Sequence, residues 1–160
     1  MRDKKRMTYR ITGLEPARFA HLFLLDEESL AARGVVRMAV TDKPGFPCRI
    51  TLDDAEPGET VLLLNHESIA SGPYAARHAI FVSEGRDRPA VYDDRVPPAL
   101  DRRKLSLRGF DQDDLMVDAV LVEPGEADGA IRRLFDSPAI RYIHAHNAVR
   151  GCFAAAVERA

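Results

Sequence analysis

The hydrophobic pattern of this chain changes twice between residues 115 and 146. Residues 115–122 are almost uniformly apolar, and residues 140–146 alternate. Between them, apolar side chains recur at i, i+3, i+4, i+7 and i+8 over residues 127–135. These periods predict a strand, an amphipathic helix near 125–136 and a second strand. The order allows one parallel crossover, as in ferredoxin-like units, and favours a mixed fold.

Two short helices are expected near the N-terminus. Pro16 suits the first turn of a helix over residues 16–24. Asp26 can cap a second helix, and Gly34 can adopt the left-handed conformation that ends it.

Strand patterns recur through the rest of the chain, at residues 35–41, 48–52, 60–66, 78–83, 105–110 and 152–158. The segments 48–52 and 60–66 flank a Pro-Gly turn, so they are predicted to pair as a hairpin. Residues 115–122 are apolar on both faces except for Asp118, which predicts a central place in a sheet.

These elements predict one α+β domain built around a largely antiparallel sheet. The domain is expected to span residues 7–160, after a disordered extension at residues 1–6. Half of the twenty residues 85–104 are charged and three are proline, so this stretch is expected to be a surface loop, and a short charged helix within it is the open alternative.

The charge balance and the cysteine count exclude several classes of protein. Lys and Arg number 23 against 25 Asp and Glu, a balance that argues against a nucleic-acid binder or a basic membrane-surface protein. No apolar run approaches the roughly 20 residues of a membrane span. Two cysteines far apart in the chain suit a reduced, cytoplasmic setting. No phosphate-binding loop or dinucleotide fingerprint is present, so we expect no cofactor.

One polar face is predicted on the strand that begins near residue 140. Alternation places Tyr142, His144 and His146 on one side of this strand. A five-residue hairpin loop would then set Cys152 opposite His146 and Ala154 opposite His144. Such a pairing would leave open space over the imidazoles.

Three interpretations of this face remain open. The first is a solvated or internally hydrogen-bonded sheet face, the ordinary pattern of a half-buried strand. The second is a metal site, with His144 and His146 as ligands and Cys152 or His66 as the third. The third is a nucleophile pair in which His146 or His144 is the base for the thiol of Cys152.

A second polar cluster lies in the first half of the chain. Arg49 is a lone cation in an apolar segment, so it either pairs with an acid such as Asp118 or binds an anion. Its neighbour Cys48 is interpreted as a buried small hydrophobe. For Arg108 the local partner Asp111 favours a structural role.

A set of short motifs in this chain resembles the bacterial domain of unknown function family 1203. The motifs are Pro47-Cys48-Arg49, the Pro57-Gly58-Glu59 turn, Pro73-Tyr74, Ile80-Phe81-Val82, Arg108-Gly109-Phe110-Asp111, and His144, Asn147, Ala148, Gly151, Cys152 and Phe153. The resemblance implies a one-domain bacterial cytosolic protein. It implies no activity, and it supplies no catalytic residues.

The leading hypothesis is a domain that binds a small, anionic molecule and has a catalytic role. Its polar groups would come from both halves of the chain, namely Arg49, His66, Tyr74, His78, Tyr142, His144, Asn147 and Cys152. Cys152 and His144 are the candidate catalytic residues. The rival hypothesis is a non-catalytic interaction or assembly module, and a second copy of the chain is the candidate protein partner.

Overall fold

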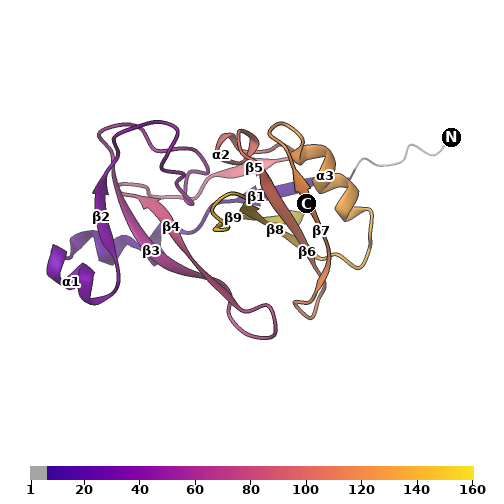
Figure 1. The fold of residues 1–160 in the computed structure, drawn as a ribbon, viewed down its shortest axis with the longest axis horizontal. Coiled ribbons are helices and arrows are strands. Elements are labelled where there is room, and N and C mark those ends of the chain that lie inside the picture. Colours follow the sequence, from indigo (N-terminus) through magenta and orange to yellow (C-terminus); the bar gives the residue numbers. More distant parts are fainter. Residues whose placement is uncertain (1–6) are drawn as a thin grey trace.

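The strands pair with antiparallel neighbours and divide into two sheets in the computed structural model, which describes residues 7–160 (Figure 1). The larger sheet has the order β5-β1-β9-β8-β6-β7. Its strands are β1 (Tyr9–Thr12), β5 (Val91–Asp93), β6 (Leu105–Phe110), β7 (Met116–Val122), β8 (Tyr142–Asn147) and β9 (Phe153–Arg159). The smaller sheet has the order β2-β3-β4, with strands β2 (Val36–Ala39), β3 (Thr60–Ile69) and β4 (Ala76–Ser83). The predicted α+β domain with largely antiparallel pairing is confirmed. The predicted extension at residues 1–6 lies outside the described residues.

The helices are short, and their positions follow the sequence signals. They are the 3-10 helices η1 (Pro16–Arg18) and η2 (Ala20–Leu24), and the α-helices α1 (Glu27–Ala32), α2 (Pro98–Asp101) and α3 (Ala127–Phe135). Asp26 caps α1 by accepting a hydrogen bond from the backbone N–H of Ser29, and Gly34 follows at φ +70°. The predicted helix over residues 16–24 is instead two 3-10 turns that meet at the buried Phe19. Within residues 7–160, no helix has the length and apolar character needed to cross a membrane.

The main core lies between α3 and one face of the larger sheet. The apolar stripe of α3 is buried, as its spacing predicted, against Leu105 and Leu107 of β6 and Ile143 and Ala145 of β8. β7 and β8 are both antiparallel to β6 and lie on either side of it, so they run in the same direction. The predicted crossover is therefore present, with β6 inserted between its two strands.

The predicted hairpin between residues 48–52 and 60–66 is wrong. β3 pairs with β2 and β4, and residues 48–52 form a tight turn in which Leu52 donates to the carbonyl of Cys48. The backbone of this turn is hydrogen-bonded to four other parts of the chain, through Leu14, Phe81, Ala90 and Ala99. An alternating run of five residues cannot separate such a turn from a strand, because both can bury every second side chain.

Close backbone approach holds this turn against the end of β1. A Cβ atom on Gly13 would lie 2.0 Å from the carbonyl oxygen of Ile50, so only glycine fits there. The N–H of Leu14 donates to the carbonyl of Arg49 at 2.8 Å. The position of Arg49 is therefore set by the larger sheet.

Two other predictions are corrected by the structure. β7 is an edge strand and not a central one, and Val117 and Leu121 on it are exposed. Only one face of β7 packs apolar side chains towards α3. The charged stretch 85–104 is not wholly a solvated loop, because it contains β5 and α2, and Ala99 and Leu100 are buried in the main core.

Candidate ligand-binding site

The opposite face of the larger sheet carries the polar residues of β8. Ile143 and Ala145 are fully buried on the α3 side, so alternation puts Tyr142, His144 and His146 on the other side, as predicted. The predicted register with β9 is wrong. His146 lies opposite Phe153, because Asn147 meets Cys152 at the start of the turn, and the register shift between Ala145 and His146 then places His144 opposite Ala156. A small residue still faces His144, but Cys152 does not face His146.

Aromatic packing links this face to the smaller sheet. Phe153 lies at the centre, with its ring centroid 5.1 Å from that of His144, 5.9 Å from that of His146 and 5.5 Å from that of His66. His78 pairs with His66 across β3 and β4. The ring centroid of His78 lies 4.9 Å from that of His146. The predicted histidines from the two halves of the chain are thus brought together.

The aromatic layer continues outward from His144. The ring centroids of Tyr142 and His144 are 5.0 Å apart, and the ring of Phe110 stacks on that of Tyr142 with centroids 5.3 Å apart. Tyr74 meets the edge of Phe110 at 5.7 Å. Burial raises the pKa of Tyr142, and its hydroxyl donates to Asp114 at 2.7 Å. This end of the layer is a packed, hydrogen-bonded surface.

The imidazoles in this layer are neutral near pH 7. Burial lowers the pKa of His66, His144 and His146 to about 4, and the pKa of His78 also falls because of burial. A neutral imidazole is the form that binds a metal. However, residues 7–160 contain no group of three or more His, Cys, Asp or Glu side chains that could hold a metal ion. The geometry therefore gives the predicted zinc site no support.

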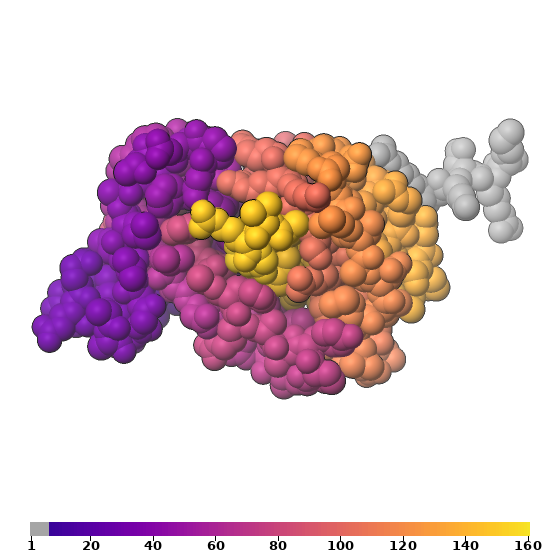
Figure 2. Space-filling model, in the orientation of Figure 1, coloured from indigo at the N-terminus to yellow at the C-terminus, as the bar shows by residue number. Residues whose placement is uncertain are grey.

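A cavity of about 800 Å³ lies beside the histidine layer. Four segments line it: the 45–49 loop, the β3–β4 hairpin, residues 103–104 before β6, and the 147–152 turn between β8 and β9. Figure 2 shows the C-terminal segment in yellow between the N-terminal half and the orange part of the chain. Of the eight predicted site residues, four line this cavity, namely Arg49, His78, Asn147 and Cys152. The other four, His66, Tyr74, Tyr142 and His144, belong to the aromatic layer behind it.

Arg49 is the most buried cation of the cavity wall. Its side chain donates to the carbonyls of Phe153 at 2.8 Å and Pro47 at 2.5 Å, and to the sulfur of Cys152 at 3.0 Å. Burial lowers the pKa of Arg49, and the nearby Cys152 acts in the opposite direction. The predicted partner Asp118 lies on the exposed edge strand β7 and makes no contact with Arg49. Within the described chain, Arg49 has no carboxylate partner.

Cys152 is bonded to the cavity wall rather than to a histidine. Besides Arg49, the side-chain amide of Asn147 donates to its sulfur at 3.5 Å. Nδ1 of His146 instead meets the carbonyl of Gly151 at 3.1 Å, and no imidazole within residues 7–160 hydrogen-bonds the sulfur. The predicted Cys–His pair is therefore not formed, because the N–H of Asn147 donates to the carbonyl of Cys152, so that Asn147 and not His146 meets Cys152.

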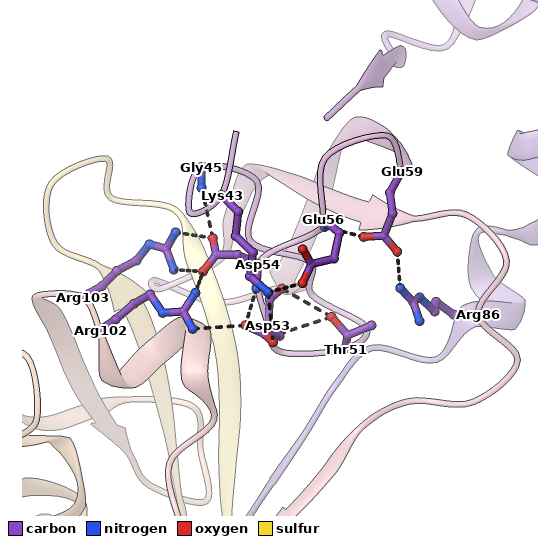
Figure 3. Close-up of polar contacts among 10 residues, drawn as sticks. All are labelled: Lys43, Gly45, Thr51, Asp53, Asp54, Glu56, Glu59, Arg86, Arg102 and Arg103. Carbon is purple, nitrogen blue, oxygen red and sulfur yellow. Dashed lines mark hydrogen bonds and ion pairs between the residues drawn. The ribbon is translucent and has the colours of Figure 1, made fainter. Parts of the chain in front are cut away.

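The buried carboxylate of Asp54 orients part of this wall (Figure 3). It accepts hydrogen bonds from Arg102 at 2.6 Å and from Arg103 at 2.5 Å, and its side chain is fully buried. Burial would raise the pKa of Asp54, but the two arginines outweigh it and hold the pKa below its usual range. Asp54 was not among the predicted site residues, because its partners lie in the charged stretch 85–104, which was predicted to be a surface loop.

The cavity wall is strongly cationic although the chain has a net charge of −2. Five of its described lining residues are Arg or Lys and none is Asp or Glu, the cations being Arg49, Arg77, Arg103, Lys104 and Arg150. Of these, only Arg49 was among the predicted site residues. The Arg102-Arg103-Lys104 run and the Arg before Gly151 were the available signals, but charge runs are usually solvated.

Two smaller predictions concern Cys48 and Arg108. Cys48 is buried, as predicted, and its sulfur accepts hydrogen bonds from the backbone N–H groups of Ile50 and Ser83. Arg108 does not pair with Asp111; its Nε donates to the hydroxyl of Ser106 at 3.2 Å. Asp111 instead accepts backbone N–H groups of its own turn.

Comparison with known proteins gives one match, to a protein-family model. The model, described as "Protein of unknown function (DUF1203)", matches residues 45–159. Every residue that lines the large cavity lies within this range. No curated protein and no solved structure matches the chain. Because the match covers more than half of its length, the chain belongs to the DUF1203 family of proteins of unknown function.

Proposed function

We propose that this protein binds a small anionic molecule in the cavity between the two sheets. The observation that carries the proposal is the cavity of about 800 Å³ whose wall holds five cations and, among the described residues, no carboxylate. A cavity of this size is typical of small-molecule sites. A lone buried cation is costly unless an anion compensates it, which makes Arg49 the expected centre of recognition.

The ion pairs around the cavity indicate the charge of the ligand. Three of the five cations already meet a carboxylate: Arg103 meets Asp54, Arg77 meets Glu67, and Lys104 meets Glu123. In contrast, Arg49 and Arg150 make no ion pair within the described chain. Two uncompensated guanidinium groups suit a ligand with one or two negative charges.

The remaining wall indicates the body of the ligand. Pro47, Leu63, Phe81 and Val149 line the cavity with apolar surface. Arg49 uses three of its five N–H donors in the protein, which leaves two for a ligand. A carboxylate or phosphate on a short carbon skeleton would satisfy both parts, since the guanidinium fork matches these groups.

Calorimetry with matched ligands tests this function. Succinate, glutathione and inorganic pyrophosphate are titrated into the protein, with succinamide as the uncharged analogue of succinate. We expect heat of binding for at least one anion, and its affinity should fall with added salt. Succinamide should give no heat of binding. Absence of binding by all three anions at low salt would contradict the proposal.

Two variants assign the binding to the cavity. Arg150→Gln removes an exposed, unpaired cation of the wall, and we expect affinity to fall about threefold to fivefold, since an exposed charge pair contributes up to about 1 kcal/mol. Arg88→Gln removes an exposed cation outside the cavity, and it should leave the affinity unchanged. Equal losses in both variants would show that the anion is attracted only by overall charge.

We also propose that the protein works in a reducing cytoplasmic compartment. Both cysteines are free, and Cys152 is partly exposed to the cavity. Secreted proteins seldom keep such thiols. Alkylation of freshly lysed cells followed by mass measurement should find Cys152 reduced in the resting state; a predominantly oxidised Cys152 would contradict this location.

A homodimer formed through β7 is a second candidate function, favoured by the exposed apolar side chains of this edge. Leu121 is 59% exposed and Val117 is 43% exposed on a strand that has a partner on one side only. Antiparallel pairing of β7 with its own copy is two-fold symmetric and would place these side chains beside apolar side chains of the second copy. We expect light scattering to give twice the mass of one chain and Leu121→Lys to give the monomer. A monomeric wild-type protein at millimolar concentration would exclude this dimer.

A further inference from the structure

We propose that Cys152 exchanges disulfides with small anionic disulfides and forms a mixed disulfide inside the cationic cavity. The inference rests on the proposed anion-binding function and deepens it, because it names the reactive group of the cavity and the class of molecule that meets it. The chemical class is a carboxylate-bearing low-molecular-weight thiol, in its disulfide form.

The position of Cys152 in the cavity wall is the first observation. Cys152 is partly exposed, and its sulfur accepts hydrogen bonds from Arg49 at 3.0 Å and from Asn147 at 3.5 Å. Guanidinium and amide donors stabilise negative charge on sulfur, and the thiolate is the form that attacks a disulfide. Cys48 is the natural contrast, because it is 1% exposed and lies in the smaller sheet's core.

An unsatisfied amide oxygen next to this sulfur is the second, independent observation. Asn147 is 8% exposed and lines the cavity, and its Oδ1 has no hydrogen-bond partner within residues 7–160. A buried acceptor without a donor is costly, so a ligand N–H is the expected partner. The site is thus complementary to a ligand whose carboxylates accept from the arginines and whose amide or ammonium N–H donates to Asn147. Peptide thiols carry all of these groups.

No acid or imidazole within residues 7–160 hydrogen-bonds the sulfur of Cys152, and this determines the reaction class. Acyl transfer would require a general acid and an oxyanion site, and the imidazoles of the neighbouring layer do not reach this sulfur. Disulfide exchange needs neither, because the leaving group departs as a thiolate. The cations of the wall would stabilise that departing charge.

The exchange balances without any further reactant. The Cys152 thiolate attacks one sulfur of the disulfide RSSR, a bond forms between Sγ and that sulfur, and the original S–S bond breaks to release RS⁻. Cys152 is oxidised and the departing sulfur is reduced. A second RS⁻ reverses the step by attacking the attached sulfur, which returns Cys152 and RSSR.

The test compares three disulfides that differ in charge. The full-length reduced protein is mixed separately with glutathione disulfide, bis(2-hydroxyethyl) disulfide and cystamine, which are anionic, neutral and cationic. Adducts are timed by intact mass and located by peptide mapping, and each rate is divided by the rate of the same disulfide with free N-acetylcysteine. We expect the normalised rate with glutathione disulfide to exceed that with cystamine at least tenfold, with the adduct on Cys152.

Variants separate the cavity from general thiol chemistry. Cys152→Ser should form no adduct, Arg150→Gln should reduce the preference for the anionic disulfide severalfold, and Arg88→Gln should retain it. Equal normalised rates for all three disulfides, or adducts mainly on Cys48, would overturn the proposal.

Calorimetry on Cys152→Ser distinguishes this proposal from the anion-binding function. If this variant binds reduced glutathione but the wild-type protein shows no charge-selective exchange, the disulfide proposal alone is wrong. If it binds none of the anions tested and no exchange occurs, both proposals are wrong. Binding together with selective exchange supports both.

Discussion

The two faces of β8 are equally buried but chemically opposite. Ile143 and Ala145 are 0% exposed against α3, whereas His144 and His146 are 7% and 2% exposed on the face towards the smaller sheet. Burying an alkyl side chain stabilises the fold, but burying an imidazole adds the cost of removing a polar group from water. The first face therefore holds the sheet together, and the second keeps polar groups at some expense to stability.

The elements that cover the two faces of β8 also differ, one being apolar and the other partly polar. One helix with a continuous apolar stripe closes the first face. The second is covered by the β3–β4 hairpin through aromatic contacts, and a cationic cavity remains at its rim. The buried polar layer therefore lies next to the cationic cavity.

Lowering the pH should expose the difference between the faces most strongly. The pKa of His66, His144 and His146 is about 4 in the folded protein and about 6.5 in the unfolded chain, so the unfolded state binds more protons in between. Stability is therefore full above pH 6.5 and is lost as the pH falls towards 4. We expect urea unfolding to show a loss of about 1 to 2 kcal/mol per imidazole between pH 7.5 and 5.

Two histidine variants assign this pH dependence to the buried layer. His144→Gln should remove about a third of the loss, because one of three similar groups no longer titrates. His21→Gln changes an exposed histidine of η2 and should leave the slope intact. A stability that does not change between pH 7.5 and 5 would show that the imidazoles gain access to water in the folded state.

Truncation of neighbouring residues on opposite faces should rank the two faces at constant pH. Ile143→Ala leaves a cavity against α3, and we expect it to lower the free energy of unfolding by about 2 to 5 kcal/mol. His144→Ala should cost less at pH 7.5, since it also removes a buried Nδ1 that has no partner among the described residues. Urea unfolding measures both. An equal or larger cost for His144→Ala would show that both faces stabilise the fold alike.

Removal of the Asp54 carboxylate should affect the rim of the cavity with the smallest change in stability. Asp54→Asn breaks ion pairs with Arg102 and Arg103, whose side chains are 35% and 21% exposed, so solvent limits the expected cost to about 1 to 2 kcal/mol. Because Arg103 loses its counter-charge, we expect anion affinity to rise in the same variant. Asp53→Asn, at a more exposed carboxylate, serves as the control and should change neither quantity.

Most of the elements could be predicted because they depend on local periodicity. The stripe of α3, the cap at Asp26 and the alternation of β8 all follow from spacing within a few residues. The predictions were wrong where contacts with segments distant in sequence determine the local structure. Residues 48–52 are held as a turn by four remote segments, and β7 is an edge because β8 pairs on the other side of β6.

The candidate site divides in the same way. Alternation alone placed Tyr142, His144 and His146 on one face. However, no pattern in the sequence could show that Cys152 meets Arg49, since this contact depends on where the turn after β8 begins and on a second turn about a hundred residues earlier. The cationic residues 103–104 resembled a solvated run, because their partner Asp54 is distant in sequence.

The sequence by itself determined the α+β class, the helix that covers one face of the sheet, and the polar character of the other face, since these depend on side chains a few residues apart. Only the tertiary structure decided that five cations and one thiol share a cavity. The physical reason is that the electrostatic role of a charged side chain depends on its partners in space: Asp54 neutralises Arg103, whereas Arg49 is buried without a carboxylate partner among residues 7–160.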